Sequence, residues 1–597
     1  MQHSFHIPVL GLGYSIDTPL KVARYGISSV VSIVDDELIE RMRKYHSDLH
    51  KEPYHYIGKE EDDSRAKRIT AYLNLLQKLV SEQISAIKLQ SFDAFNDLRM
   101  YFELLPESAV LKKSYQQMLR QEEGTEKMLL QQELKNKITA GRIDVNIMSK
   151  VDKVNYLKGL PLGDADTDAL AALRGFANSN LQSSLVISAG LNPRLFSYME
   201  TFPDFFPDAL GGYFKKIILK VSDYRSAMIQ AKILAKKGLW VSEFRIESGL
   251  NCGGHAFATE GLLLGPILQE FKDNHANLYA DLFQLYTNAM HVKNPDADMP
   301  NLPQQKITVQ GGLGTAEEHN FLLSQYEVDA IGWGSPFLLV PEATNVDEQT
   351  LKDLASATER DFYLSNSSPL GIPFNNFRKS SAELQRLERI SQGRPGSPCT
   401  KKFLVSNTEF TKEPICTASR KYQSLKIKQL KSLALDEEHL DNQISIITEK
   451  LCLCEGLCAS AYLSDDILKP RENKAVSICP GPNLAYFSRK YSLREMVDHI
   501  YGRCDLLKGV HRPNLFIKEL GLYVDYLKKE FENLQEDVKK LKSLRKFYDQ
   551  LQNGIGYYRE LIRKTDPALN LWNAEQVKMF NAAIDELTGN LFTPITR

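Results

Sequence analysis

The sequence predicts a parallel (β/α)8 barrel with a helical insertion and a mainly helical C-terminal extension. Eight short apolar runs alternate with helix-compatible segments over residues 1–345, and the first run is not followed by a G-x-G-x-x-G motif. Apolar runs of this kind are typical of parallel strands that helices cover. Eight of them favour a closed barrel over an open, doubly wound sheet.

Most gaps between the predicted strands are long enough for a helix, as a βα repeat requires. Residues 55–140 interrupt the repeat with long helical stretches that contain no strand signal, so we expect a helical insertion there. The eight strands are IPVLGLG (7–13), SSVVSIV (28–34), IDVNIM (143–148), LVISAG (185–190), KKIILKV (215–221), EFRIESG (243–249), KITVQGG (306–312) and VDAIGWG (328–334).

The chain is too long for one domain. Its 597 residues exceed the roughly 250–300 residues at which single cores stop growing. We predict the barrel over residues 1–345, an irregular and helical segment that contains most cysteines over 346–510, and a helical hairpin over 511–597. The hairpin is expected to break near NGIGYY (553–558), where two glycines interrupt the helical pattern.

Composition and charge exclude several classes of protein. Apolar residues make up 43% of the chain and charged residues 25%, and the formal net charge is −1. This is the balance of a globular protein with no overall attraction to nucleic acid or to an anionic membrane. The sequence has no 18-residue apolar run and no signal-peptide pattern, so we expect a cytoplasmic protein.

The last two predicted strands end in glycine-rich loops, which begin at Gly311 and Gly332. In (β/α)8 barrels the loops after strands seven and eight commonly bind phosphate. Glycine lets backbone N–H groups approach an anion closely, and a helix that begins after the loop adds the positive end of its dipole. The alternative is that these glycines only make tight turns, but two such loops favour phosphate binding.

A second cluster, SGLNCGGH (248–255), follows the strand EFRIE. A histidine behind paired glycines at the carboxyl end of a strand can point into the barrel mouth, and its chemistry suits proton transfer. His255 is therefore a candidate catalytic residue, with a structural histidine as the alternative. Cys252 is a second candidate, either as a covalent nucleophile or as a small buried thiol that packs beside a cofactor.

The order of these motifs resembles the nitronate monooxygenase family of FMN barrels, formerly called 2-nitropropane dioxygenases. The most specific match is Gly249–His255, which is similar to the family's G-x-E-A-G-G-H pattern. The opening strand, the strands that contain Asn146, Ser188 and Lys220, and the last two strands are also similar. The trans-acting enoyl reductases of polyunsaturated fatty acid synthases resemble this barrel too.

The resemblance implies an FMN site at the barrel mouth, with His255 on the substrate side. Two departures put a nitronate substrate in doubt: Asn251-Cys252 replaces the family's Glu-Ala, and ordinary members lack the C-terminal extension. The implied phosphate-binding residues are Gly311, Gly312, Gly334 and Ser335, those near the isoalloxazine ring are Asn146 and Lys220, and the other cofactor-binding positions are Gly11, Ser188, Gly253, Gly254 and Gly332.

Seven of the eight cysteines lie between Cys399 and Cys504. In a reducing compartment such a group is more typical of a metal site or of buried thiols than of a disulfide framework. A C-x-C-x3-C run and a later Cys-Pro step favour an iron–sulfur cluster, although the spacing matches no ferredoxin or zinc pattern. A cluster, a structural zinc ion and unliganded thiols all stay open, and the best ligand set is Cys416, Cys454, Cys458 and Cys479.

The leading hypothesis is an FMN-dependent oxidoreductase, either a monooxygenase or a reductase, in which His255 transfers a proton beside the flavin. Its substrate is a small molecule or an acyl chain, and reduction of a carbon–carbon double bond is the alternative reaction. A redox partner and an oligomer are compatible with the sequence. The competing class is a scaffold protein, in which a non-catalytic barrel presents the insertion and the tail to partners.

Overall fold

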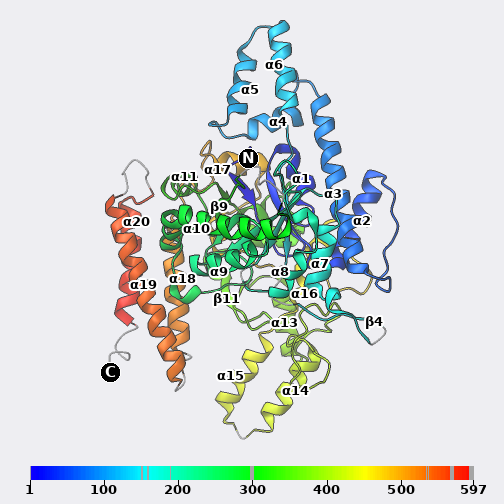
Figure 1. The fold of residues 1–597 in the computed structure, drawn as a ribbon. Coiled ribbons are helices and arrows are strands. Elements are labelled where there is room, and N and C mark those ends of the chain that lie inside the picture. The colour runs from blue at the N-terminus through cyan, green and yellow to red at the C-terminus, as the bar shows by residue number, and fades with distance from the viewer. Residues whose placement is uncertain are drawn as a thin grey trace.

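The chain folds around a closed barrel of eight parallel strands (Figure 1). The computed structural model describes residues 2–148, 152–157, 160–188, 190–295, 302–433, 435–532, 534, 537–564 and 571–590. The order around the barrel, β1-β10-β9-β8-β7-β6-β3-β2, confirms the predicted (β/α)8 fold. The strands are β1 (Phe5–Ile7), β2 (Ser28–Ser32), β3 (Ile143–Ile147), β6 (Ser183–Ile187), β7 (Lys215–Val221), β8 (Val241–Glu247), β9 (Lys306–Gln310) and β10 (Ala330–Gly332).

The first strand lies earlier than the predicted run 7–13, and that prediction was wrong. β1 covers only Phe5–Ile7, and all three residues are buried. Pro8 follows directly and has no N–H group to donate to a strand ladder, so pairing ends there. Residues 8–12 instead line the mouth of the barrel.

Helices cover the outside of the barrel, and several begin at a polar cap directly after a strand. Asp35 accepts hydrogen bonds from two N–H groups of α2, Asp223 caps α9, and Thr315 and Glu318 form a capping box on α11. The covering helices are α1 (Thr18–Val22), α2 (Asp36–His50), α7 (Asp168–Ala177), α8 (Pro193–Met199), α9 (Tyr224–Ala235), α10 (Leu264–Lys293) and α11 (Ala316–Gln325).

A buried charged network fills the inside of the barrel below its mouth. Arg245 on β8 donates hydrogen bonds to Asp144 on β3 at 3.1 Å and to Glu243 at 2.7 Å. Burial raises the pKa of Glu243, but the charges of Arg245 and Arg142 and the hydrogen bond from Thr308 act together against burial, and the pKa is lowered to about 2. The side chains of Arg245, Asp144 and Glu243 are nearly inaccessible to solvent, so the barrel interior is a packed ionic core and no channel.

The predicted insertion forms four helices between β2 and β3. Helix α3 (Ser64–Leu89) packs against α2 and α7, and so joins the insertion to the barrel. The shorter helices α4 (Asp97–Leu104), α5 (Val110–Arg120) and α6 (Thr125–Asn136) follow it. In Figure 1, α5 and α6 extend away from the barrel at one end of the molecule.

The extension after residue 345 shares a continuous hydrophobic core with the barrel. It contains a two-stranded antiparallel sheet of β11 (Phe362–Ser365) and β12 (Phe374–Phe377). Among the described residues no helix is long and apolar enough to cross a membrane. The helices are α12 (Glu348–Ala355), α13 (Ser381–Ser391), α14 (Arg420–Lys431), α15 (Glu437–Thr448), α16 (Leu453–Ser464), α17 (Leu493–Ile500), α18 (Leu515–Glu532), α19 (Val538–Lys564) and α20 (Ala574–Asn590).

The predicted break near residues 553–558 does not occur, because α19 runs through this segment without interruption. Gly554 lies where α19 meets the residues before α10, and a Cβ atom there would lie 2.7 Å from Leu263 Cδ1. The glycine therefore allows close packing of two segments instead of ending a helix. The tail consists of three helices, α18, α19 and α20, and not of the predicted hairpin.

The return from the insertion into β3 depends on a close backbone approach at Gly141. A Cβ atom on this residue would lie 2.0 Å from the carbonyl oxygen of Ile27, which leads into β2. We predict that Gly141→Ala lowers the free energy of unfolding by about 1–3 kcal/mol, because backbone must move to relieve the contact. Gly521→Ala on α18, where a Cβ atom meets nothing within 4 Å, is the control and leaves stability equal or higher. Equal thermal unfolding temperatures for the two variants would contradict this prediction.

Candidate active site

The carboxyl ends of all eight barrel strands open into one large cavity of about 1310 Å³. Small-molecule sites are typically roughly 300–1,000 Å³, so this cavity has room for a nucleotide-sized cofactor together with part of a substrate. The extension supplies much of its outer wall, from residues 370–374, 403–404, 453–457 and 478–483, and from helices α18 and α19.

The structure brings the residues that the sequence predicted for the site into this one cavity. Their roles in binding or catalysis stay predictions. They are Gly11, Asn146, Ser188, Lys220, Cys252, Gly253, Gly254, His255, Gly311, Gly312, Gly332, Gly334 and Ser335.

The loop after β9 has a shape that only glycine tolerates well. Gly311 and Gly312 have positive φ angles of 118° and 78°. A buried arginine of the extension, Arg512, donates a 2.6 Å hydrogen bond to the carbonyl oxygen of Gly312. The N–H and C=O of one peptide group point in opposite directions, so this bond turns the N–H of Leu313 away from Arg512.

Two backbone amide groups, one in the loop after β9 and one in the loop after β10, lack an acceptor among the described residues. No other described residue accepts a hydrogen bond from the backbone N–H of Gly312, which is buried, or from that of Gly334. Buried N–H groups are nearly always paired, so the N–H of Gly312 calls for an acceptor beyond the described residues, and the half-buried N–H of Gly334 is available to the same acceptor. Ser335 Oγ accepts a 2.7 Å hydrogen bond from the N–H of Gly481, which leaves the Ser335 hydroxyl proton free to be donated.

Two polar side-chain atoms in the cavity also lack a partner among the described residues. Ser32 Oγ and Asn251 Oδ1 are buried and have no hydrogen-bond partner among the described residues. Both residues line the cavity, Ser32 at the end of β2 and Asn251 in the loop after β8. Leaving such atoms unpaired costs about 1–3 kcal/mol each, a cost that a polar ligand or ordered water removes.

An ion pair lies at the ends of β7 and β8. Lys220 Nζ is 2.9 Å from Glu247 Oε2, and Gln310 donates a 2.8 Å hydrogen bond to the other carboxylate oxygen. Burial lowers the pKa of Lys220, but the charge of Glu247 and the hydrogen bond to its carboxylate together outweigh burial, and the pKa is raised. Lys220 is therefore a charged ammonium group at neutral pH, held at a fixed position in the mouth.

Cys252 lies beside this pair in a setting that does not favour a nucleophile. Its thiol donates a 3.6 Å hydrogen bond to the carbonyl oxygen of Gln310. Burial, followed by the charge of Glu247, raises the pKa of Cys252 well above the usual value for a thiol. A reactive cysteine needs a lowered pKa, so the geometry favours the alternative of a small thiol packed in the cavity wall.

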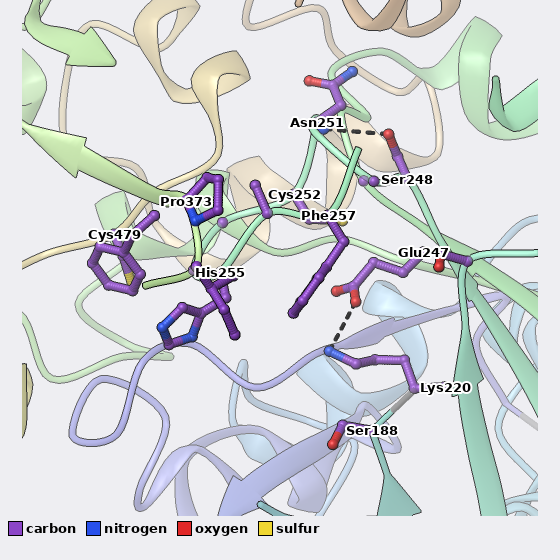
Figure 2. Close-up of a pocket in the computed structure, with 18 of the residues that line it drawn as sticks. Ser188, Lys220, Glu247, Ser248, Asn251, Cys252, His255, Phe257, Pro373 and Cys479 are labelled. Atoms are coloured by element: carbon purple, nitrogen blue, oxygen red, sulfur yellow. Dashed lines mark hydrogen bonds and ion pairs between the residues drawn. The ribbon is translucent and has the colours of Figure 1, made fainter. Parts of the chain in front are cut away.

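His255 lies on the opposite side of Phe257 from the ion pair (Figure 2). Its Nε2 atom forms a 2.7 Å hydrogen bond with the hydroxyl group of Ser368, and its ring contacts Phe374 edge to face at a centroid distance of 5.0 Å. Ser368 and Phe374 both belong to the extension. The imidazole is half-buried and oriented, which is the condition for a side chain that exchanges a proton with a bound substrate.

The four cysteines predicted as metal ligands are not gathered at one point. Cys454 and Cys479 line the cavity, whereas Cys416 lies beside Cys399 and the Cys458 thiol donates to Asp35 Oδ2 at 3.2 Å. All eight cysteines are free, and the described residues contain no group of three or more ligands that could hold a metal ion. The structure therefore does not support the predicted iron–sulfur cluster, because other contacts of the fold separate its ligands.

Several residues of the site were not predicted from the sequence. Glu247 had a local signal, because it ends a strand at the face where barrel enzymes hold their catalytic groups. Ser368, Gly481 and Arg512 had none, because they belong to the extension and reach the cavity only through folding.

Comparisons with known proteins add little to this geometry. No family model matches the sequence, and no curated protein matches it. Among solved structures, the chain is similar to the enoyl reductase domain of MlnA from the macrolactin biosynthesis cluster of Bacillus amyloliquefaciens. The two are 13% identical, the match covers 63% of this chain and 84% of that chain, and the TM-score is 0.33. A likeness of this extent says nothing about the activity of this chain.

The thiol environments predict an order of alkylation. Contact with Cys416 lowers the pKa of Cys399 to about 7, whereas burial raises the pKa of Cys252. Because the thiolate is the reacting species, iodoacetamide at pH 7.5 should modify Cys399 at least tenfold faster than Cys252. Cys504 is exposed, but its pKa is also raised, so it should react more slowly than Cys399. Peptide mass spectrometry over time measures these rates. Modification of Cys252 first would restore it as a candidate nucleophile.

Proposed function

We propose that this protein is an FMN-dependent oxidoreductase whose site is the cavity at the barrel mouth. The observation that carries the proposal is the glycine-rich wall formed after β9 and β10, where the buried N–H of Gly312 and the N–H of Gly334 have no acceptor from the described residues. Loops at these two positions of a (β/α)8 barrel are the usual phosphate site, and amide donors suit a phosphate group.

The other residues of the cavity fit the remaining parts of FMN. Asn146 and Lys220 lie at the ends of β3 and β7 and line the same cavity, so they are available to the polar edge of a flavin ring. Ser32 and Asn251 offer buried polar atoms that lack partners among the described residues. When bound, FMN supplies hydride and electron transfer, chemistry that no amino-acid side chain provides.

In this proposal, protein side chains position the charges and the proton. Glu247 holds Lys220 at 2.9 Å, so the ammonium group offers a fixed positive charge at the ring end of the cavity. His255 exchanges a proton with the substrate, and its hydrogen bond with Ser368 orients the imidazole for that exchange. Phe374, which packs edge to face against the imidazole, and the partly exposed Phe257 are apolar groups of the wall near His255.

A second candidate, reduction of a carbon–carbon double bond in an acyl chain, is favoured by the wall of the cavity. An acyl chain would cover the apolar side chains of the wall from water, whereas a small nitronate would leave most of them uncovered. These side chains come largely from the extension, which ordinary nitronate monooxygenases lack. The apolar side chains are Phe257, Leu370, Ile372, Phe374, Leu404, Leu453 and Leu457.

Binding of FMN tests the proposal directly. Fluorescence titration of flavin-free protein should show that FMN binds at least tenfold more tightly than riboflavin, because only FMN carries the phosphate. Ser335→Ala should weaken binding of FMN and leave binding of riboflavin unchanged, while the exposed Ser356→Ala changes neither. Colourless protein that binds neither flavin would sink the proposal and favour a scaffold protein.

The role of His255 is separated from cofactor binding by a second experiment. We predict that His255→Ala keeps the affinity for FMN within about twofold and slows substrate-dependent turnover by roughly 10²-fold, the usual contribution of a general acid–base group. His439→Ala, on the surface of α15, is the matched control. Anaerobic assays with NADH, NADPH or reduced ferredoxin as the donor, and with a nitronate or an enoyl thioester as the substrate, identify the reaction. Loss of FMN from His255→Ala would instead assign His255 to the cofactor.

A further inference from the structure

Helix α18 of the extension contacts the loop that carries His255 with one face. Leu515, Glu519 and Tyr523 are spaced four residues apart and so lie on the same side of the helix. Asn251 Nδ2 donates a 3.1 Å hydrogen bond to the carbonyl oxygen of Leu515. A Cβ atom on Gly249 would lie 2.4 Å from the Tyr523 hydroxyl oxygen. The helix thus fits closely against the first residues after β8.

The Glu519 carboxylate holds both ends of one segment. Its Oε1 atom accepts a 2.5 Å hydrogen bond from the Ser248 hydroxyl, and its Oε2 atom accepts a 2.8 Å bond from the backbone N–H of Leu264. Ser248 Oγ in turn accepts a 3.2 Å bond from the N–H of Asn251. Residues 248–264, which include His255, are therefore fastened at their start and at their end by the two oxygens of one side chain.

A buried carboxylate at position 519 reduces the stability of the fold when it is ionised. Glu519 is 1% exposed, and the hydrogen bonds of its carboxylate within the described structure come from the uncharged Ser248 hydroxyl and Leu264 amide. Burying an ionised group without a counter-charge is unfavourable. An apolar residue would pack α18 against the barrel at lower cost, but it could not accept two hydrogen bonds from the two ends of the segment.

We propose that Glu519 is a positioning residue of the active site, which fixes segment 248–264 and through it the place of His255 in the cavity. The inference deepens the proposed function and rests on it for the role of His255. We call the two hydrogen bonds that Glu519 accepts, from Ser248 and from Leu264, the clamp. The clamp is a property of the folded chain, with or without a cofactor.

The clamp should respond to pH because Glu519 titrates near neutrality. Burial raises its pKa to about 7, while hydrogen bonds from Ser248 and Leu264 oppose this rise. The titratable groups that face it are Cys252 in the segment, Tyr523 on α18, Tyr558 on α19 and Tyr326 after α11. Burial raises the pKa of each of these four, so they stay neutral from pH 5 to pH 8.

The direction of the pH effect follows from linkage. A carboxyl group whose pKa is higher in the folded state than in water is stabilised there when protonated. Opening of segment 248–264 that hydrates Glu519 therefore becomes easier as the pH rises from about 5 to 7, and changes little above that. We expect hydrogen–deuterium exchange, corrected for its intrinsic rate, to show protection of this segment falling on the order of 10²-fold over this range.

Three variants test the clamp on the full-length protein. Glu519→Gln should abolish the pH dependence of protection, Ser248→Ala should lower protection most at residues 248–255, and the exposed Glu532→Gln on the same helix should behave as wild type. In the FMN-loaded protein, Glu519→Gln should lower kcat about tenfold, because the position of His255 changes. FMN affinity should fall by less than this, because the glycine loops after β9 and β10 lie outside the segment.

The outcomes separate the clamp from the proposed function. Wild-type protein that binds no flavin would refute the function, and the exchange experiment would still decide the clamp. Unchanged, pH-dependent protection in Glu519→Gln would overturn the clamp even if FMN binds. An equal loss of protection over the whole of α18 and the barrel would also overturn it, because that result indicates a general effect on stability.

Discussion

The closed parallel barrel is the constraint on which the rest of the structure depends. Parallel strands that close into a ring bring their eight carboxyl ends to one face. Residues that are hundreds of positions apart in the sequence, such as Ser32, Lys220 and Gly334, meet there around a single cavity. The buried network of Arg245, Asp144 and Glu243 fills the interior of the barrel beneath them.

The extension completes the cavity and is not an appended module. Ser368 bonds to His255, Gly481 donates to Ser335, and Arg512 orients the loop at Gly312. Each contact joins a residue beyond position 345 to a residue in a loop that follows a barrel strand. The shared hydrophobic core fixes these contacts in place, so the barrel alone would lack part of the wall and the restraints on its loops.

Several buried polar groups at or beside the cavity lower the stability of the fold. Ser32 and Asn251 have buried atoms that lack partners among the described residues, and Glu519, which bonds to the lining residue Ser248, is buried beside uncharged groups. Each of these groups reduces the stability of the fold. Departures of this kind from local rules are expected where a protein binds a ligand or positions a reacting group. At the same face Glu247 holds Lys220 as a charged ammonium group.

The sequence by itself determined the barrel, the insertion and the glycine loops, because the alternation of apolar runs and the positions of glycine are local signals. It misplaced the first strand, which ends at Pro8, and the break in α19, where Gly554 serves packing against Leu263. Only the tertiary structure decided that Cys416, Cys454, Cys458 and Cys479 stay apart and that α18 reaches Ser248. These outcomes depend on contacts between residues distant in the chain, and no local pattern encodes which distant partner a side chain will meet.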